Sequence, residues 1–174
     1  TRVNWYIVSH PIFKLLHLFI SRKYNKILRE ANEEDLPIRK QRTELRSKGF
    51  HFNTDNPNFI NSNTFEDGTI VPQLKGIYRI FLKNLSQQKI NEVEAGPIKF
   101  LVELNGKNEL MIWPQVCPHQ GGPFLPENKC GKKIKCPWQG LSFSGVSLNP
   151  VQPYGDLING QIHLHLNQDE LLIS

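Results

Sequence analysis

The sequence predicts a mainly β protein with a helical arm on its N-terminal side. Two observations support this fold class. From Gly76 onward, apolar residues recur at a spacing of two in short stretches separated by turn residues, which is typical of antiparallel strands. Earlier, apolar residues recur at helical spacing over residues 11–31. We therefore expect an arm and linker over residues 1–75 and an antiparallel β-sandwich or barrel over residues 76–174.

Two helices are predicted in the arm. An amphipathic helix is expected over residues 11–31, with Pro11 at its first position, where a missing N–H has no helical partner. The acidic run at 33–35 and Pro37 are expected to break it. A second short helix fits residues 38–48.

Gly49 is the expected C-terminal stop of that second helix. Residues 51–73 follow it and are rich in Asn, Asp, Thr and Ser, which predicts a linker or a wrapping loop.

Eight strands are predicted beyond the linker, and the dipeptide Asn105-Gly106 is a two-residue hairpin signal between the third and the fourth. Residues 167–169 are turn-like and join the last two strands. The predicted strands are 77–82, 90–93, 98–104, 109–113, 133–136, 141–143, 161–166 and 170–173.

The charge of the chain is uneven. The net charge is +5, and residues 1–50 hold eleven Lys and Arg against five Asp and Glu. Basic and aromatic residues do not interleave as they do in nucleic-acid-binding proteins, so we expect no nucleic acid partner. The basic arm instead predicts a solvated helix face or a subunit contact, within a homo- or hetero-oligomer. The chain contains no run of about eighteen apolar residues, so we expect no transmembrane helix.

Three cysteines are too few, and odd in number, for a disulfide framework. Cys130 lies in a Lys-rich loop and is expected to be a free, partly exposed thiol. No secretory leader is evident, so the expected location is the cytoplasm, or an organelle interior if a targeting segment has been removed.

The other two cysteines open two similar short loops. The first loop contains Cys117, His119, Gly121 and Gly122, and the second runs Cys136-Pro137-Trp138-Gln139-Gly140. Sixteen residues separate His119 from Cys136. Thiolates and an imidazole at such spacing are typical metal ligands, and an unrelated zinc site built from these three residues is one alternative.

These two loops resemble the signature of the Rieske iron–sulfur family, C-x-H followed after about sixteen residues by C-x-x-H. In that family, two Cys bind one iron of a 2Fe–2S cluster and two His bind the other. The resemblance implies Cys117, His119 and Cys136 as ligands. Gln139 stands where the family has the second His, and it is the fourth candidate ligand.

The neighbours of these ligands have expected roles beside such a cluster. Pro137 stiffens its loop, and Trp138 shields the cluster from water together with Phe124. Three glycines allow the backbone to approach the cluster and to donate N–H groups to sulfur. They are Gly121, Gly122 and Gly140.

Several alternatives remain open at the fourth ligand position. The oxygen of Gln139, or a water molecule, can complete the cluster. The cluster can instead be lost while the fold is kept, or another metal can be bound. Cys130 can replace Gln139 only if the segment between the loops folds back.

The resemblance implies a module that transfers single electrons to or from a redox partner, such as a reductase or an oxygenase. Only 34 residues follow Gly140, so we expect any oxygenase reaction to occur on a partner or on a further part of the protein. A structural or regulatory subunit without a working cluster is the main rival. A weaker one is a small oxygenase that uses His163, His165 and Asp169 as iron ligands.

Overall fold

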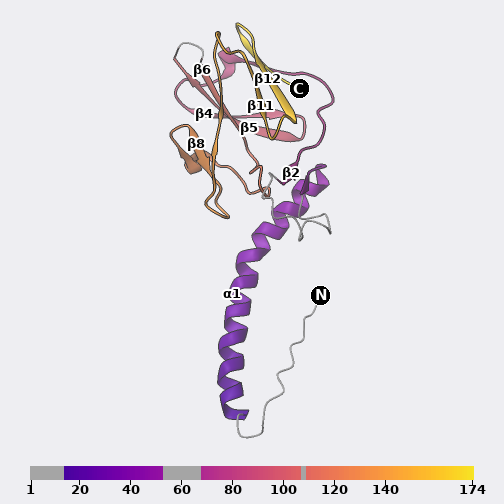
Figure 1. The fold of residues 1–174 in the computed structure, drawn as a ribbon, viewed down its shortest axis with the longest axis vertical. Coiled ribbons are helices and arrows are strands. Elements are labelled where there is room, and N and C mark those ends of the chain that lie inside the picture. The colour runs from indigo at the N-terminus through magenta and orange to yellow at the C-terminus, as the bar shows by residue number, and fades with distance from the viewer. Residues whose placement is uncertain (1–13, 53–67, 107–108) are drawn as a thin grey trace. The chain divides into compact units, whose positions relative to one another are not determined.

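The computed structural model describes residues 14–52, 68–106 and 109–174. These residues form one long helix followed by several antiparallel sheets, which confirms the predicted fold class (Figure 1). The chain divides after Lys40 into two compact units, and residues 41–75 lie in the same unit as the strands that follow. No helix within the described ranges is long and apolar enough to cross a membrane.

Helix α1 (Lys14–Ser47) is continuous and carries Pro37 inside it, so the predicted break into two helices is wrong. A proline within a helix removes one backbone hydrogen bond and crowds the preceding turn, at a cost of about 3 kcal/mol, but it does not have to end the helix. Helical residues on both sides of Pro37 outweigh that local cost. The predicted start at Pro11 lies outside the described residues.

The predicted stop at Gly49 is confirmed. Gly49 has a φ of 89°, in the left-handed region that glycine adopts without a steric penalty. The N–H of Gly49 donates to the carbonyl of Arg46 at 3.0 Å, and that of Phe50 donates to the carbonyl of Leu45 at 3.1 Å. This pair of bonds is the Schellman arrangement, which satisfies the last helical carbonyls and turns the chain toward the sheets.

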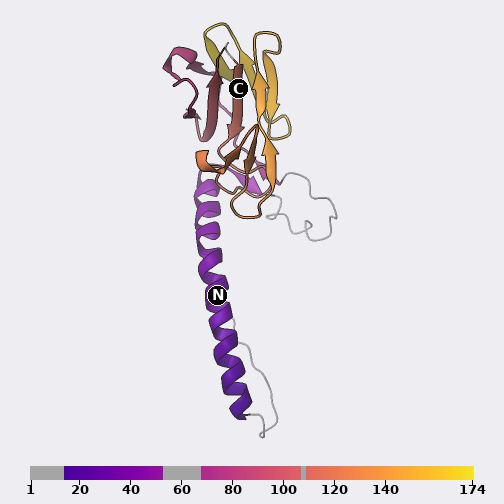
Figure 2. The ribbon, with the colours of Figure 1, turned by 90° about the vertical axis from the view of Figure 1, so that its left-hand side faces the viewer.

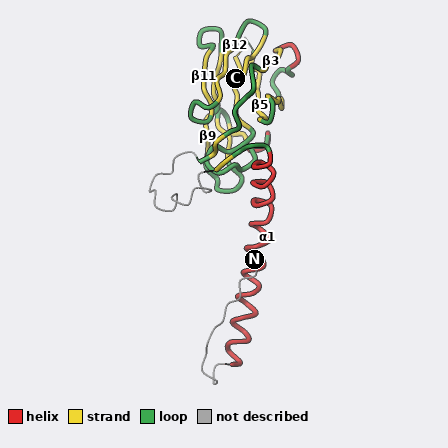
Figure 3. Tube along the Cα trace, turned by 90° about the vertical axis from the view of Figure 1, so that its right-hand side faces the viewer, coloured by secondary structure: helices red, strands yellow, loops and turns green. Residues whose placement is uncertain are grey.

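All eight predicted strands are present, and the described residues contain five additional short strands. Figure 3 draws the strands in yellow. The described part of the chain also contains the 3-10 helices Leu82–Asn84 and Pro126–Asn128. The predicted strands appear as β3 (Tyr78–Phe81), β4 (Ile90–Ala95), β5 (Ile98–Asn105), β6 (Glu109–Pro114), β8 (Lys133–Lys135), β9 (Ser142–Ser144), β12 (Ile162–Leu166) and β13 (Glu170–Ile173). The additional ones are β1 (His51–Phe52), β2 (Thr69–Ile70), β7 (Lys129–Cys130), β10 (Val146–Leu148) and β11 (Tyr154–Leu157).

Every described strand pair is antiparallel. Two sheets have four strands each, in the orders β10-β6-β5-β4 and β11-β12-β13-β3, a third has the order β7-β8-β9, and β1 pairs with β2. The C-terminal strands, drawn in yellow, lie beside the pink strands β4, β5 and β6 of the first sheet in two perpendicular views (Figures 1 and 2). Side chains of β5 and β6 join those of β12 and β13 in one core.

Strand β6 is buried on both faces from Leu110 to Pro114, and Leu101 of β5 is buried on the second face beside it, so the two strands contribute to two cores. Phe100 and Ile112 belong to the larger core between the two four-stranded sheets. Leu101 and Trp113 point the other way, as alternation along a strand requires, and belong to a smaller core with Ile134 of β8. Both motif cysteines lie in this smaller core.

Two turn and linker expectations need correction. Asn105 pairs with Glu109 at the end of the β5–β6 ladder, so Asn105 lies in the strand rather than in a two-residue turn. The predicted linker is partly structured, because β1 and β2 pair with each other at its two ends. Within that segment, residues 53–67 lie outside the described residues. The turn predicted at 167–169 is confirmed by the pairing of β12 with β13.

Gly145 tests the packing of the smaller core. A Cβ at this position would lie 2.6 Å from two atoms of the buried Trp113 ring and 2.9 Å from the Ile112 carbonyl oxygen. We expect Gly145→Ala to lower the free energy of unfolding by about 1–3 kcal/mol, measured by denaturant titration. Gly106→Ala is the matched control, because a Cβ there meets nothing within 4 Å. Equal stability of the two variants would contradict the packing described for Trp113.

Candidate metal centre

The first loop is closed by backbone hydrogen bonds around Cys117. The N–H of Cys117 donates to the carbonyl of Gly122 at 2.7 Å, and the N–H of Gly121 donates back to the carbonyl of Cys117 at 2.9 Å. Gly121 has a φ of 78°, which lets the chain reverse. Val116 and Pro123 form a bridge at the base of the loop.

The second loop repeats this pattern around Cys136. Its N–H donates to the carbonyl of Leu141 at 2.7 Å, and the N–H of Gly140 donates to the carbonyl of Cys136 at 2.8 Å. Gly140 has a φ of 70°. The two loops therefore share one backbone conformation, which follows from their shared sequence, Cys-Pro-x-Gln-Gly.

The two thiols lie side by side and are almost completely buried. Cys117 is 0% exposed and Cys136 is 1% exposed. The Cys117 thiol is hydrogen-bonded to the Cys136 sulfur, and this bond, followed by burial, raises the pKa of Cys117. The same bond is the main cause that lowers the pKa of Cys136 to about 6. One sulfur of the pair therefore carries negative charge more readily than an ordinary cysteine.

Backbone amides also point at each sulfur. Cys117 receives hydrogen bonds from the backbone of Gln120 and His119, and Cys136 receives them from Trp138 and Gln139. Each set lies two and three residues after its cysteine. Such amides stabilise thiolate sulfur. They are not the amides of the glycines expected in this role, because the N–H groups of Gly121 and Gly140 donate to the Cys117 and Cys136 carbonyls.

The loops are packed tightly against each other. A Cβ on Gly122 would lie 2.8 Å from the Cys136 sulfur and 3.2 Å from the Trp138 ring, so the first loop can approach the second only with glycine here. Phe124 is fully buried in the smaller core, and Trp138 packs against that core while partly exposed. Pro137 is exposed at the surface.

A chain of polar side chains crosses the tip of the two loops. His119 Nδ1 and Gln139 Oε1 lie 2.7 Å apart. Gln139 Nε2 donates to Gln120 Oε1 at 3.1 Å, and the same oxygen accepts from Arg42 Nη2 at 2.7 Å. The two side chains at the predicted non-sulfur ligand positions are thus direct neighbours.

The observed donors fit a two-iron cluster in part. Two adjacent thiols with amide donors suit one iron, and His119 and Gln139 lie close enough to share a second one, since donors on one tetrahedral metal are roughly 3.4 Å apart at metal–ligand distances of about 2.1 Å. Gln139 supplies an amide oxygen in place of an imidazole. Among the described side chains, no three His, Cys, Asp or Glu gather around one point that could hold a single metal ion. A two-iron cluster does not need such a group, because its ligands are divided between two irons.

That result gives no support to the alternative of a single zinc ion held by Cys117, His119 and Cys136. Cys130 is a free, exposed cysteine, as expected.

The C-terminal histidines do not form the suggested iron site. His163 Nδ1 lies 2.7 Å from Asp156 Oδ1 rather than beside Asp169. His165 stacks on Tyr154, with ring centroids 4.4 Å apart. Both pairs follow from the register of β11 with β12, which places Asp156 opposite His163 and Tyr154 opposite His165. The structure therefore gives no support to a small oxygenase with His163, His165 and Asp169 as iron ligands.

Sequence reasoning missed Thr69 and Arg42 as part of the site. Thr69 is fully buried, its hydroxyl donates to the Cys117 carbonyl at 2.9 Å, and its N–H donates to the Pro118 carbonyl at 2.7 Å. Neither residue carries a metal-ligand signature. Gln120 was detectable, since it occupies the same position in its loop as Gln139.

Thr69 fastens β2 to the first loop, and its removal should loosen that loop. Thr69→Val removes the hydroxyl but keeps the shape, so we expect a loss of about 1 kcal/mol in the free energy of unfolding. Amide exchange of Gly121, which donates to the same carbonyl, should accelerate. Ser147→Ala is the control, because it removes a hydroxyl bonded to Glu109, away from the loops. Unchanged Gly121 exchange in Thr69→Val would show that β2 does not hold the loop.

Comparison with known proteins agrees with this site. Residues 79–152 match the family model described as Rieske [2Fe-2S] domain, and this range includes both cysteine loops. No curated protein and no solved structure matches the chain. The resemblance expected from the two loops is thereby confirmed over residues 79–152, where the chain is similar to Rieske domains.

Proposed function

We propose that this chain is an electron-transfer module that binds a 2Fe–2S cluster between its two loops and serves a redox partner. The observation that supports the proposal best is the pair of buried, adjacent thiols, each with two backbone amides directed at its sulfur. Burying two thiols and aligning amide donors on them has no evident benefit for packing alone. It is the environment that a thiolate-bound metal requires.

In this proposal Cys117 and Cys136 hold one iron, and His119 and Gln139 hold the other. When bound, the cluster supplies reversible one-electron transfer. The chain positions the four donors on two loops of equal conformation. Phe124 and the smaller core exclude water from the sulfur side, while the exposed Gln139 keeps the other side near the surface. A partner can therefore approach closest at His119 and Gln139.

The partner is proposed to be a reductase, an oxygenase, or both. Residues 1–50 are proposed to dock that partner or another copy of the chain, since Tyr24, Ile27 and Leu36 of the helix are exposed apolar residues. The cytoplasm, or the interior of an organelle, remains the proposed location.

The second candidate function is a structural or regulatory subunit that keeps the fold without a cluster. The observation that favours it is the direct hydrogen bond between His119 and Gln139. In this bond the two proposed metal ligands satisfy each other's polar atoms without a metal. Iron content separates the two proposals.

Serine at either loop cysteine should abolish iron binding. Cys117→Ser and Cys136→Ser each replace a soft thiolate by a hydroxyl, so protein purified without oxygen should lose iron, acid-labile sulfide and visible absorption. Cys130→Ser is the matched control, because Cys130 is exposed and free. Full iron and colour in either loop variant would rule out the proposed ligands, and colourless native protein would favour the subunit without a cluster.

Histidine at position 139 should strengthen iron binding. Gln139→His replaces an amide oxygen by an imidazole nitrogen, a better donor to iron, so iron retention against a chelator should rise. The pH dependence of the reduction potential should show one more ionisation in the variant than in the native protein, because an imidazole carries an outer proton that an amide lacks. Potentiometry across pH measures both.

Two ionisations in the native protein would show that another histidine has taken the fourth position. Iron in neither protein would show that the loops no longer bind a cluster.

A further inference from the structure

The polar chain at the loop tip has a direction that begins at Arg42. A guanidinium group has only donors, so whatever contacts it must present an acceptor. Arg42 Nη2 donates to Gln120 Oε1 at 2.7 Å, and Arg42 Nε donates to the Gln120 backbone carbonyl at 3.2 Å. The amide oxygen of Gln120 is therefore held on the side of Arg42.

The position of the Gln120 oxygen in turn fixes the orientation of the Gln139 amide. The oxygen of Gln120 also faces the side chain of Gln139 at 3.1 Å, and an oxygen there can only accept, so Gln139 must turn its NH₂ group toward it. The opposite side of the amide, its oxygen, then faces His119 Nδ1 at 2.7 Å. An NH₂ group cannot bind iron, whereas the oxygen can, so the orientation of this amide decides whether Gln139 can act as a ligand.

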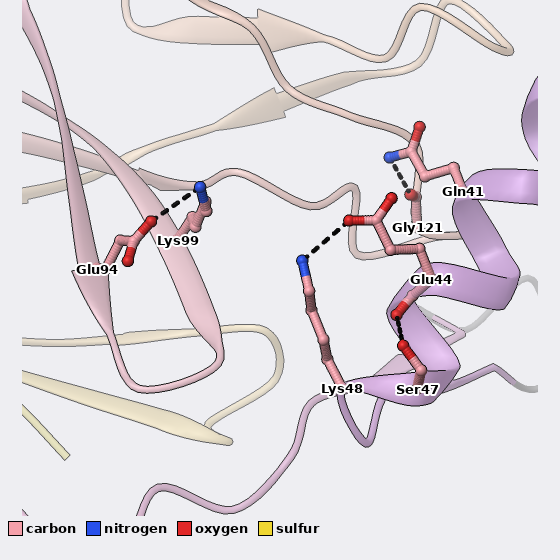
Figure 4. Close-up of polar contacts among 7 residues, drawn as sticks. All are labelled: Gln41, Glu44, Ser47, Lys48, Glu94, Lys99 and Gly121. Carbon is pink, nitrogen blue, oxygen red and sulfur yellow. Dashed lines mark hydrogen bonds and ion pairs between the residues drawn. The ribbon is translucent and has the colours of Figure 1, made fainter.

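Contacts with neighbouring residues hold Arg42, at the end of helix α1, beside Gln120. The guanidinium lies 5.5 Å from the centre of the Phe52 ring and 5.7 Å from that of Trp138. Gln41 Nε2 donates to the Gly121 carbonyl at 3.3 Å, which ties the same helical turn to the first loop (Figure 4). A Cβ on Gly121 would overlap the Phe52 ring and lie 3.2 Å from the Leu45 side chain, so the helix end, β1 and the loop are in close contact.

We propose that Arg42 is a positioning residue of the metal centre: through Gln120 it turns the amide of Gln139 so that the oxygen lies on the side of His119 as the fourth donor. This inference rests on the proposed function for its purpose, but the orientation itself is a property of the chain. It explains how an amide, which can present either of two ends, serves at a position where the family signature has histidine.

Two variants remove the link in different ways. Arg42→Met removes the donor from the helix, and Gln120→Leu removes the acceptor from the loop without changing the charge of the helix. Gln120→Glu keeps oxygens that accept from both Arg42 and Gln139, and it should behave like the native protein. Arg46→Met is the matched control, because Arg46 lies over the same Phe52 ring, at 5.4 Å, and its loss removes the same charge from the same helix end.

The first readout uses the metal-free protein and nitrogen NMR of the His119 ring and the Gln139 side-chain amide. We expect one dominant His119 tautomer in the native protein and in the variants Gln120→Glu and Arg46→Met. In that tautomer the proton lies on Nδ1 and faces the Gln139 oxygen. In Arg42→Met and Gln120→Leu, we expect a mixture of tautomers and changed Gln139 amide signals. Unchanged signals in both of these variants would overturn the proposal.

The second readout is iron release to a chelator from protein loaded with iron and sulfide. Arg42→Met and Gln120→Leu should each release iron roughly ten-fold to a hundred-fold faster, as is typical when a residue that supports a metal ligand is lost. The double variant should be no faster than either single one, because both remove the same link. Additive effects, or equal release by Arg46→Met, would overturn the proposal in favour of a general charge effect. Absence of iron from every protein would refute the proposed function alone, while the NMR readout would still decide the role of Arg42.

Discussion

The contact between two buried thiols is the constraint on which the rest of this structure depends. Cys117 and Cys136 come from loops that are nineteen positions apart in the chain, and each is almost fully buried. A buried sulfur that carries charge is costly unless donors surround it. Both loops meet that requirement in one way, by turning the backbone at a glycine with positive φ so that two amides face the sulfur. The geometry that the two loops share is therefore a property of the backbone.

The sheets serve this contact by supplying a second core. Ordinary sandwich strands have one buried face, but β6 is buried on both and Leu101 of β5 adds to its second face, so Leu101 and Trp113 pack in one core with the two cysteines. The β7-β8-β9 sheet carries the second loop across this face. Because Ile134 of β8 is fully buried beside the cysteines, the position of the second loop is fixed by apolar packing as well as by its own hydrogen bonds.

Hydrophobic periodicity and the cysteine motif predicted the longer strands and the two loops, but not the short strands or the tertiary contacts around the loops. Long alternating strands such as β5 and the Schellman end at Gly49 follow from local rules, so they were predictable. Strands of two or three residues, such as β2, carry too little pattern to be recognised. The uninterrupted helix at Pro37 was not predictable, because a local breaking signal lost to the helical preference of both flanks. Arg42 and Thr69 reach the site through tertiary contacts across 78 and 48 positions of sequence, which no local signal reports.

The repeated Cys-Pro-x-Gln-Gly sequence places two glutamine amides at equivalent positions of loops that share one backbone conformation. Gln120 and Gln139 occupy equal positions in equal loops, and the contact between the loops brings their side chains together. Histidine at position 139 would present a ring nitrogen from a rigid plane, whereas a glutamine amide can present either oxygen or nitrogen. A hydrogen-bond acceptor beside the Gln139 amide removes this ambiguity, because only the NH₂ group can face it. Gln120 presents its oxygen there because that oxygen also accepts from Arg42. In the proposed metal centre, the helix end therefore has a role alongside the loops, since the proposed donor atom of Gln139 is oriented by a guanidinium that the helix supplies.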